Sequence, residues 1–142
     1  MEKKNLKSPS ILLVDDDDID ASGVKRALQK MRVANPLVRA KDGLEALEIL
    51  KTQGVEAPFL ILLDLNMPRM NGLEFLEVLR SDGPWKNAVV FVLTTSKADE
   101  DRVSAYEKHI AGYIIKEKLH DGFEELITLL GHYWRLVEFP DN

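Results

Sequence analysis

The sequence contains no cysteine. A disulfide framework, a thiol nucleophile and a thiolate metal site are therefore excluded, and the absence fits a reducing compartment. Long apolar runs are missing too, because the longest, Phe59–Leu63 and Val89–Leu93, are far shorter than the ~20 residues that a membrane-spanning helix needs. We therefore expect a cytoplasmic protein with no membrane contact.

The sequence also lacks an excess of positive charge. The chain has 19 Lys and Arg against 24 Asp and Glu, which gives a formal net charge of -5 at pH 7. Surfaces that bind nucleic acid usually carry a clustered excess of basic residues, so we expect no nucleic-acid partner. The 142 residues are 45% hydrophobic and 30% charged. This balance is typical of one ordinary globular domain.

Short β-rich runs alternate along the chain with segments of helical period. The pattern predicts five strands, at Ser10–Val14, Leu37–Ala40, Phe59–Leu63, Val89–Leu93 and Tyr113–Ile115. Three of them are continuous apolar runs, which is typical of strands covered on both faces in a parallel sheet. The sequence therefore predicts an α/β domain with a doubly wound, five-stranded parallel sheet and helices on both faces.

Capping signals mark three of the expected helix starts. In each, a polar residue precedes an acidic one by three positions, which is the spacing of a capping box. The pairs are Asp42 and Glu45, Asn71 and Glu74, and Ser96 and Asp99. The last helix has the clearest apolar face, formed by Phe123, Leu126, Ile127, Leu130, Trp134 and Val137.

Acidic side chains follow two of the expected strands. Asp15 and Asp16 follow the first strand and Asp64 follows the third, at the end of the sheet where doubly wound folds bind ligands. Carboxylates gathered in one place repel unless a cation lies between them, and oxygen ligands without His or Cys favour Mg²⁺. A helix start, where negative charge is favoured, better explains the other acids of the first run, which are Asp17, Asp18 and Asp20.

A hydroxyl and an ammonium follow two further strands. Thr94 follows the fourth strand and Lys116 follows the fifth. Such groups suit a phosphoryl group, because its charge is spread over three oxygens. With a carboxylate nucleophile and a divalent cation they form a set that can make and break an aspartyl phosphate. Each residue alone is a weak signal, so the hypothesis depends on their joint placement.

Four motifs at these positions resemble the receiver domain of two-component response regulators, across essentially the whole chain. They are Ile11–Asp16, Leu63–Gly72, Leu93–Ser96 and Gly112–Lys116. The resemblance implies the flavodoxin-like fold, with strand order 2-1-3-4-5. It assigns residues 10–131 to the receiver domain, 1–9 to a flexible lead-in and 132–142 to an apolar extension of the last helix.

The resemblance also implies roles for individual acidic residues. Asp64 is expected to accept a phosphoryl group from the phosphohistidine of a sensor histidine kinase. Asp16, Asp64 and the backbone carbonyl of Asn66 are expected to hold Mg²⁺, for which Mn²⁺ could substitute. Asp15 is expected to reach the ion directly or through water.

Other roles implied by the resemblance concern binding and switching. Thr94 and Lys116 are expected to bind the phosphoryl oxygens. Tyr113 matches the receiver aromatic that changes rotamer as the hydroxyl moves, although a half-buried strand aromatic is the plainer interpretation. The switching surface is then the fourth helix, fifth strand and fifth helix. Asn66 and Ser96, two positions after the acceptor and the hydroxyl, are expected to tune water access.

The chain departs from the receiver pattern directly after Lys116. Receivers usually have proline at the next position, often in a cis peptide, whereas this chain has Glu117. A cis peptide before a residue other than proline costs ~2.5 to 4 kcal/mol. We therefore expect a trans Lys116–Glu117 peptide and a rearranged loop.

The end of the chain is short and apolar. After Lys116 there remain 142 − 116 = 26 residues, so we expect no covalently attached effector domain. The aromatic tail His132–Pro140 resembles that of single-domain regulators serving phytochrome-type kinases, and an exposed apolar patch usually indicates an interface. We therefore expect such a kinase as partner and a homodimer through the last helix and tail. Alternatively, Trp134 and Phe139 fold back on their own core.

Three classes of function remain open. The favoured one is a single-domain signalling protein, which is not an enzyme beyond catalysing its own phosphorylation and dephosphorylation. Such a protein either ends a pathway or, as the alternative, passes phosphate to another histidine as a phosphorelay intermediate. A phosphatase of the haloacid dehalogenase type needs an acid where this chain has Asn66. A binding module that has lost phosphorylation is disfavoured by the intact set of Asp15, Asp16, Asp64, Thr94 and Lys116.

Overall fold

The computed structural model describes residues 9–81, 83–119, 122–136 and 139. The expected flexible lead-in lies outside the described residues except for Pro9. Of the expected tail 132–142, residues 137, 138 and 140–142 also lie outside them. No helix in the described part of the chain is long and apolar enough to cross a membrane.

Five parallel strands form one sheet in the order β2-β1-β3-β4-β5. This confirms the doubly wound fold and the strand order expected from the sequence. The strands are β1 (Ser10–Val14), β2 (Leu37–Ala40), β3 (Phe59–Leu63), β4 (Val89–Thr94) and β5 (Gly112–Ile115). All residues of β1 and β3 are buried, which explains why these central strands are apolar without alternation.

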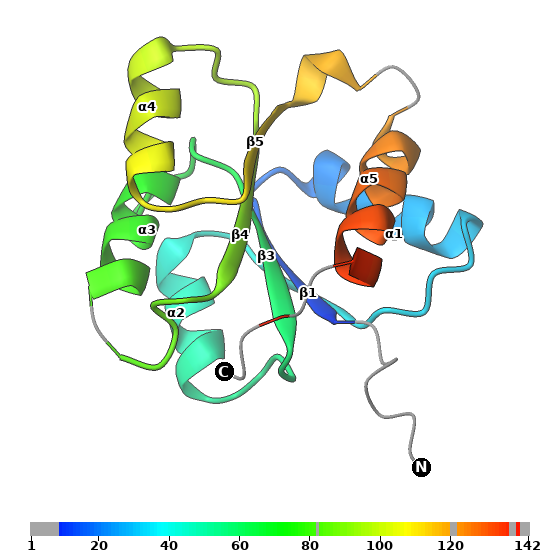
Figure 1. Cartoon of the computed structure of the whole chain (residues 1–142), viewed down its shortest axis with the longest axis horizontal. Helices are drawn as coiled ribbons and strands as arrows, with labels where there is room; N and C mark the ends of the chain where they lie inside the picture. The colour runs from blue at the N-terminus through cyan, green and yellow to red at the C-terminus, as the bar shows by residue number, and fades with distance from the viewer. Residues whose placement is uncertain (1–8, 82, 120–121, 137–138, 140–142) are drawn as a thin grey trace.

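Helices cover both faces of the sheet (Figure 1). One face carries α2 (Gly43–Lys51), α3 (Gly72–Ser81) and α4 (Asp99–Glu107). The other carries α1 (Asp18–Lys30) and α5 (Phe123–Leu136), and the short 3-10 helix η2 (Lys116–Lys118) connects β5 towards α5. Alternate residues of β1 enter two separate cores: Leu12 packs on the α2–α3 side and Leu13 on the α1–α5 side.

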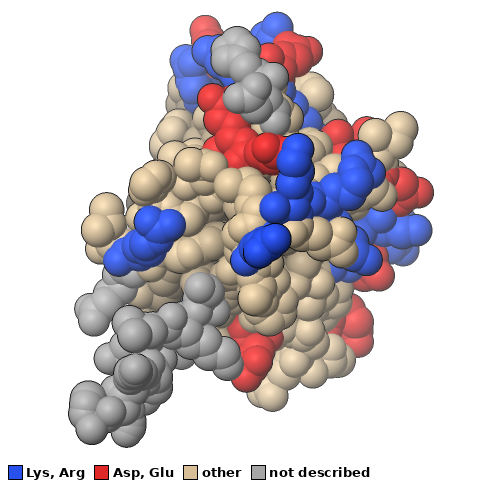
Figure 2. Space-filling view, turned by 90° about the vertical axis from the view of Figure 1, so that its right-hand side faces the viewer, with Lys and Arg blue, Asp and Glu red and all other residues tan. Residues whose placement is uncertain are grey.

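The contact between α1 and α5 is close. A Cβ atom at Gly23 of α1 would lie 2.7 Å from the ring of Phe123 in α5, so any other residue at this position requires the ring to move. The salt bridge of 3.0 Å between Lys30 and Glu124 joins the same two helices. Figure 2 views this side of the molecule and shows Lys and Arg side chains gathered on it, with acidic side chains above them, towards the carboxyl end of the sheet.

Two of the three predicted helix starts have the expected caps. At α3 the bonds are reciprocal, since Glu74 donates its backbone N–H to Asn71 Oδ1 and Asn71 donates its own to Glu74 Oε1, each at 2.9 Å. At α2 the side chain of Asp42 accepts from the N–H of Glu45 at 2.9 Å. These bonds satisfy N–H groups that have no partner within the helix.

The third predicted start is wrong. The N-cap of α4 is Ala98, without a side-chain cap, so the helix starts two residues later than a cap at Ser96 requires. The reason is that Ser96 has another partner, because its Oγ donates a hydrogen bond of 2.7 Å to Asp101 Oδ2. Ser96 Oγ also accepts from the N–H of Ala98 at 3.3 Å.

The aromatic end of the chain packs on its own core. The ring of Tyr133 lies edge-on to Phe91, with 4.9 Å between the centroids, and edge-on to Phe139 at 6.0 Å. Trp134 and Phe139 are both partly buried against the α1–α5 core, which is the alternative that the sequence left open. Val137, expected on the apolar face, lies outside the described residues. The expected homodimer is not tested by this packing and stays a prediction.

Candidate functional site

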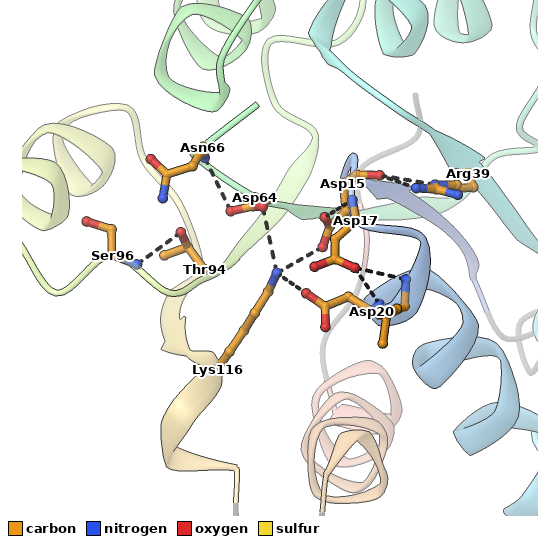
Figure 3. Close-up of polar contacts among 10 residues, drawn as sticks. Asp15, Asp17, Asp20, Arg39, Asp64, Asn66, Thr94, Ser96 and Lys116 are labelled. Atoms are coloured by element: carbon orange, nitrogen blue, oxygen red, sulfur yellow. Dashed lines mark hydrogen bonds and ion pairs between the residues drawn. The ribbon is translucent and has the colours of Figure 1, made fainter. Parts of the chain in front are cut away.

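The polar residues predicted at the strand ends gather at the carboxyl end of the sheet (Figure 3). Asp15 follows β1, Asp64 follows β3, Thr94 ends β4 and Lys116 begins η2 directly after β5. Three of these four residues are buried, with exposed fractions of 1% for Asp15, 7% for Asp64 and 0% for Thr94. The topology thus brings together side chains that are far apart in the sequence.

Three carboxylates form a candidate metal centre. Asp15, Asp16 and Asp64 each offer an oxygen, and these oxygens lie within 4.8 Å of one another. Asp15 and Asp64 are buried, whereas Asp16 is exposed. Burial raises the pKa of Asp15 to about 6, and the charge of Asp64 adds to this effect, although the N–H of Asp17 and the ammonium of Lys116 oppose it. Burial of the Asp15 carboxylate therefore disfavours its charged form when no metal ion is bound.

Lys116 is the cation within this cluster. Its Nζ lies 3.1 Å from Asp15 Oδ2, 2.5 Å from Asp20 Oδ2 and 3.7 Å from Asp64 Oδ2. Burial alone lowers the pKa of Lys116, but the bond to Asp20 and the charges of Asp15 and Asp64 outweigh burial and raise it. The ammonium therefore stays protonated at neutral pH and is available to an anionic ligand.

Asp20 is a member of the site that sequence reasoning missed. The explanation of the acidic run as a helix start holds for Asp17, whose Oδ1 accepts from the N–H of Ile19 at 2.8 Å and of Asp20 at 3.2 Å. The Asp20 carboxylate, however, reaches Lys116. The available signal was topological, because the helix after β1 begins at the carboxyl end of the sheet and its first turn lies beside the crevice.

Arg39 was also missed, and it holds the backbone of the acidic loop. From β2 its Nε and Nη2 donate to the carbonyl oxygen of Asp15 at 3.0 and 2.9 Å. Its Nη1 donates to Asp18 Oδ1 at 2.7 Å, and this hydrogen bond lowers the pKa of Asp18. A planar guanidinium that binds two groups in this way fixes their relative position.

The loop after β3 holds Asp64 from the other side. The N–H of Asn66 donates to Asp64 Oδ1 at 3.3 Å, which orients the carboxylate. A Cβ atom at Gly72 would lie only 2.4 Å from the carbonyl oxygen of Asp64. The N–H of Gly72 donates to the carbonyl of Leu65 at 3.0 Å. The first residue of α3 must therefore be glycine for this close approach.

Thr94 is linked to the loop before α4. Its Oγ1 accepts from the N–H of Ser96 at 3.3 Å, and the hydroxyl of Tyr113 donates to the carbonyl of Ser96 at 3.1 Å. Burial raises the pKa of Tyr113, which is half-buried in β5. The hydroxyl of Ser96 is engaged with Asp101 of α4. The expected role of Ser96 and Asn66 in water access stays a prediction.

The segment after Lys116 has the expected peptide geometry. Among the described residues the one cis peptide bond is Ala57–Pro58, so the Lys116–Glu117 bond is trans, as predicted. Residues Lys116–Lys118 form η2, and Glu117 makes a salt bridge of 2.6 Å with Lys97. The loop is therefore rearranged into a short helical turn joined to the segment before α4.

Comparison with known proteins identifies the class. The family model of the response regulator receiver domain matches residues 11–128, and the chain belongs to this family. Response regulator Rcp1 of Synechocystis sp. is 33% identical over 128 residues, covering 87% of each chain. The probable methanogenesis regulatory protein FilR2 of Methanothrix harundinacea is 31% identical over 127 residues, covering 87% of this chain and 82% of FilR2.

Solved structures agree with these relatives. The Mn²⁺-bound form of Rcp1 is 32% identical and superposes with a TM-score of 0.81, covering 93% of this chain and 99% of Rcp1. The phosphorylated cyanobacterial phytochrome response regulator RcpA is 30% identical, with a TM-score of 0.82 and coverages of 95% and 100%.

Membership in this family decides between the classes that the sequence left open. The protein is a response regulator of the receiver type, a signalling protein that is phosphorylated on aspartate. The phosphorelay and phosphatase alternatives are not favoured. Receiver domains bind a divalent metal at their acidic pocket, and those of phytochrome response regulators partner with sensor histidine kinases.

Proposed function

We propose that Asp64 receives the phosphoryl group from a sensor histidine kinase, in a reaction that requires Mg²⁺. The observation that carries this proposal is the position of Asp64 between a cation and two further carboxylates. Lys116 Nζ lies 3.7 Å from Asp64 Oδ2, and the oxygens of Asp15, Asp16 and Asp64 lie within 4.8 Å of one another. A phosphoryl group on Asp64 thus meets positive charge on both sides once a metal is bound.

The donor set fits a small hard cation. All three side chains offer carboxylate oxygens, and Mg²⁺ typically takes one or two carboxylates and keeps several waters. The exposed Asp16 leaves room for those waters, and the carbonyl of Asn66 is proposed as a further ligand. Mn²⁺ accepts the same ligands, and the related Rcp1 has been solved with Mn²⁺ bound. The bound ion supplies positive charge that stabilises the transferring phosphoryl oxygens.

The reaction assigned to this chain is a displacement at phosphorus. An oxygen of Asp64 attacks in line, the P–N bond of the phosphohistidine breaks, and the histidine nitrogen keeps the electron pair. Lys116 stays protonated and contacts the transferred oxygens. The hydroxyl of Thr94, which already accepts from the N–H of Ser96 at 3.3 Å, donates a hydrogen bond to one of these oxygens and keeps its proton.

Phosphorylation is proposed to switch the surface of α4, β5 and α5. The phosphoryl group adds about -1.5 to -2 charge at Asp64. Thr94 moves towards this charge, and the loop through Ser96 moves with it because the two residues share a hydrogen bond. Tyr113, bonded to the carbonyl of Ser96, then changes position. The output is a change of surface that a partner reads.

Two partners are proposed. RcpA, a related structure, is described as a phytochrome response regulator, and this supports a phytochrome-type kinase as the phosphoryl donor. A homodimer through α5 is supported by the exposure of Leu136 and Leu129 on that helix, 86% and 48%. Sedimentation at tens of micromolar tests the dimer, and a monomer with and without phosphoryl donor contradicts it.

The proposed chemistry is tested with small phosphoryl donors. The protein is incubated with Mg²⁺ and acetyl phosphate or phosphoramidate, and the intact mass is measured. One added phosphoryl group is expected for the native protein and none for Asp64→Asn. Turnover of small phosphoesters without a stable adduct, or no adduct with any donor, contradicts the proposal. Omitting Mg²⁺ or adding a chelator is expected to abolish the adduct.

A further inference from the structure

Lys116 makes its shortest carboxylate contact with Asp20, a residue that the proposed phosphoryl chemistry does not use. The Nζ–Oδ2 distance is 2.5 Å, against 3.7 Å from the same Nζ to Asp64 Oδ2. The side chains are 11% exposed for Lys116 and 23% for Asp20. In Figure 3, Asp20 and Asp64 lie on opposite sides of Nζ, and Asp15 lies between them.

The local structure of α1 leaves the Asp20 carboxylate available for this contact. Asp20 is the third residue of the helix after the N-cap Asp17, and an acidic residue there often accepts from the backbone N–H of the N-cap. Here that N–H is already taken, because Asp17 donates it to Asp15 Oδ1 at 2.9 Å. The side chain of Asp20 is therefore not needed as a cap and reaches Lys116 instead.

The packing of α1 against α5 keeps Asp20 in place. The ring of Phe123 fills the space above Gly23, and Lys30 pairs with Glu124. Both contacts lie C-terminal to Asp20 on the same helix, and on its N-terminal side the N–H of Asp20 donates to Asp17 Oδ1 at 3.2 Å, so the backbone that carries the carboxylate is held in place. Movement of the ammonium towards a group on Asp64 therefore lengthens its contact with Asp20.

We propose that Asp20 is a positioning residue that holds the ammonium of Lys116 back from Asp64 and so weakens binding of a phosphoryl group there. This inference rests on the proposed function of Asp64 and Lys116. The contact with Asp20 stabilises the unphosphorylated protein, and part of it is lost when Lys116 turns to the phosphoryl oxygens. The charge of Asp20 acts in the same direction, because it repels the incoming anion. Asp20 thus opposes phosphorylation through the same lysine that supports it.

The test measures the affinity for beryllium fluoride, used with Mg²⁺ as a phosphoryl analogue, by NMR titration of the native protein and of Asp20→Asn. The variant is expected to bind about fivefold more tightly, the change typical of removing one partly exposed ion pair. Asp20→Glu keeps the charge and can reach the ammonium, so it is expected to restore an affinity close to that of the native protein. Asp20→Ser is a second neutral variant, and melting temperatures report whether each variant is folded.

Asp18→Asn is the matched control. It removes the same charge from the same helical turn, but Asp18 pairs with Arg39, so its affinity is expected to stay within about twofold of the native value. An equal gain in Asp18→Asn, or no gain in the neutral variants of Asp20, overturns the role of Asp20. If the native protein fails to bind, or Asp64→Asn binds as tightly, the proposed function fails and this inference with it.

Discussion

The hydroxyl of Tyr113 donates a hydrogen bond of 3.1 Å to the carbonyl oxygen of Ser96. Ser96 in turn donates its N–H to Oγ1 of Thr94 at 3.3 Å. The aromatic side chain of β5 is thus joined by two hydrogen bonds to the hydroxyl at the end of β4. A displacement of Thr94 towards Asp64 must stretch this chain of contacts or carry Tyr113 with it.

We predict that a phosphoryl analogue changes the environment of Tyr113. The protein is labelled with 3-fluorotyrosine, and the Tyr113 signal is assigned by its loss in Tyr113→Phe. Beryllium fluoride with Mg²⁺ is expected to shift this ¹⁹F signal, because the hydrogen bond to Ser96 changes. The same titration of Asp64→Asn, which lacks the proposed phosphoacceptor, serves as the control and is expected to leave the Tyr113 signal in place. An unmoved Tyr113 signal at saturation contradicts its role in the switch.

Asp15 is predicted to lower the stability of the metal-free protein at neutral pH. Burial raises its pKa from 3.8 to about 6, so the folded protein binds this proton more tightly than the unfolded chain does. Binding of this proton stabilises the folded protein. The stabilisation is fully present below pH 3.8 and is lost as the pH rises through about 6. Asp15→Asn is therefore expected to be more stable than the native protein at pH 7.5 by about 1 to 2 kcal/mol.

The measurement is thermal unfolding of both proteins at pH 7.5 and pH 4 in the presence of a chelator. The difference in melting temperature is expected to shrink at the lower pH, where Asp15 is protonated. The exposed neighbour provides the matched control, and Asp16→Asn is expected to change the melting temperature little at either pH. A destabilised Asp15→Asn at pH 7.5 contradicts the assignment.

Gly72→Ala is predicted to damage the fold and the site together. The new Cβ would lie 2.4 Å from the carbonyl oxygen of Asp64 and 2.7 Å from Cα of Leu65, and these backbone atoms cannot turn away as a side chain can. We expect a loss of about 2 to 4 kcal/mol in the free energy of unfolding by urea and a slower reaction with acetyl phosphate.

The control is Gly131→Ala in α5, where the nearest atom to the new Cβ is 3.9 Å away. Because alanine favours helix, this variant is expected to be neutral or more stable by up to about 1 kcal/mol. If Gly72→Ala were as stable as the native protein, the β3–α3 loop would move away from the new Cβ at no cost. That result would contradict the prediction.

The residues of the proposed site could be predicted from the sequence because topology alone brings them together. The central strands are apolar on both faces, so their limits are clear, and β1 and β3 begin and end where predicted. Parallel strands bring their carboxyl ends to one edge. Asp15, Asp64 and Lys116 therefore meet there without any knowledge of side-chain packing.

Features that depend on side-chain competition could not be predicted in this way. Topology places the first turn of α1 beside the crevice, but it does not specify that the Asp20 carboxylate contacts Lys116, which is 96 positions away in the sequence. Ser96 has the spacing of a cap but bonds to Asp101 instead. Whether Phe139 is exposed or buried depends on how the chain turns after α5, which the pattern of apolar residues does not specify.

The measurement that tests the central claim most directly is the location of the phosphoryl group. The protein is phosphorylated with acetyl phosphate and Mg²⁺ and reduced with borohydride, which converts an aspartyl phosphate to homoserine, and its peptides are sequenced by mass spectrometry. We predict homoserine at position 64 alone, and none when the donor is left out. Homoserine at Asp15, Asp16 or Asp20 instead would contradict the account.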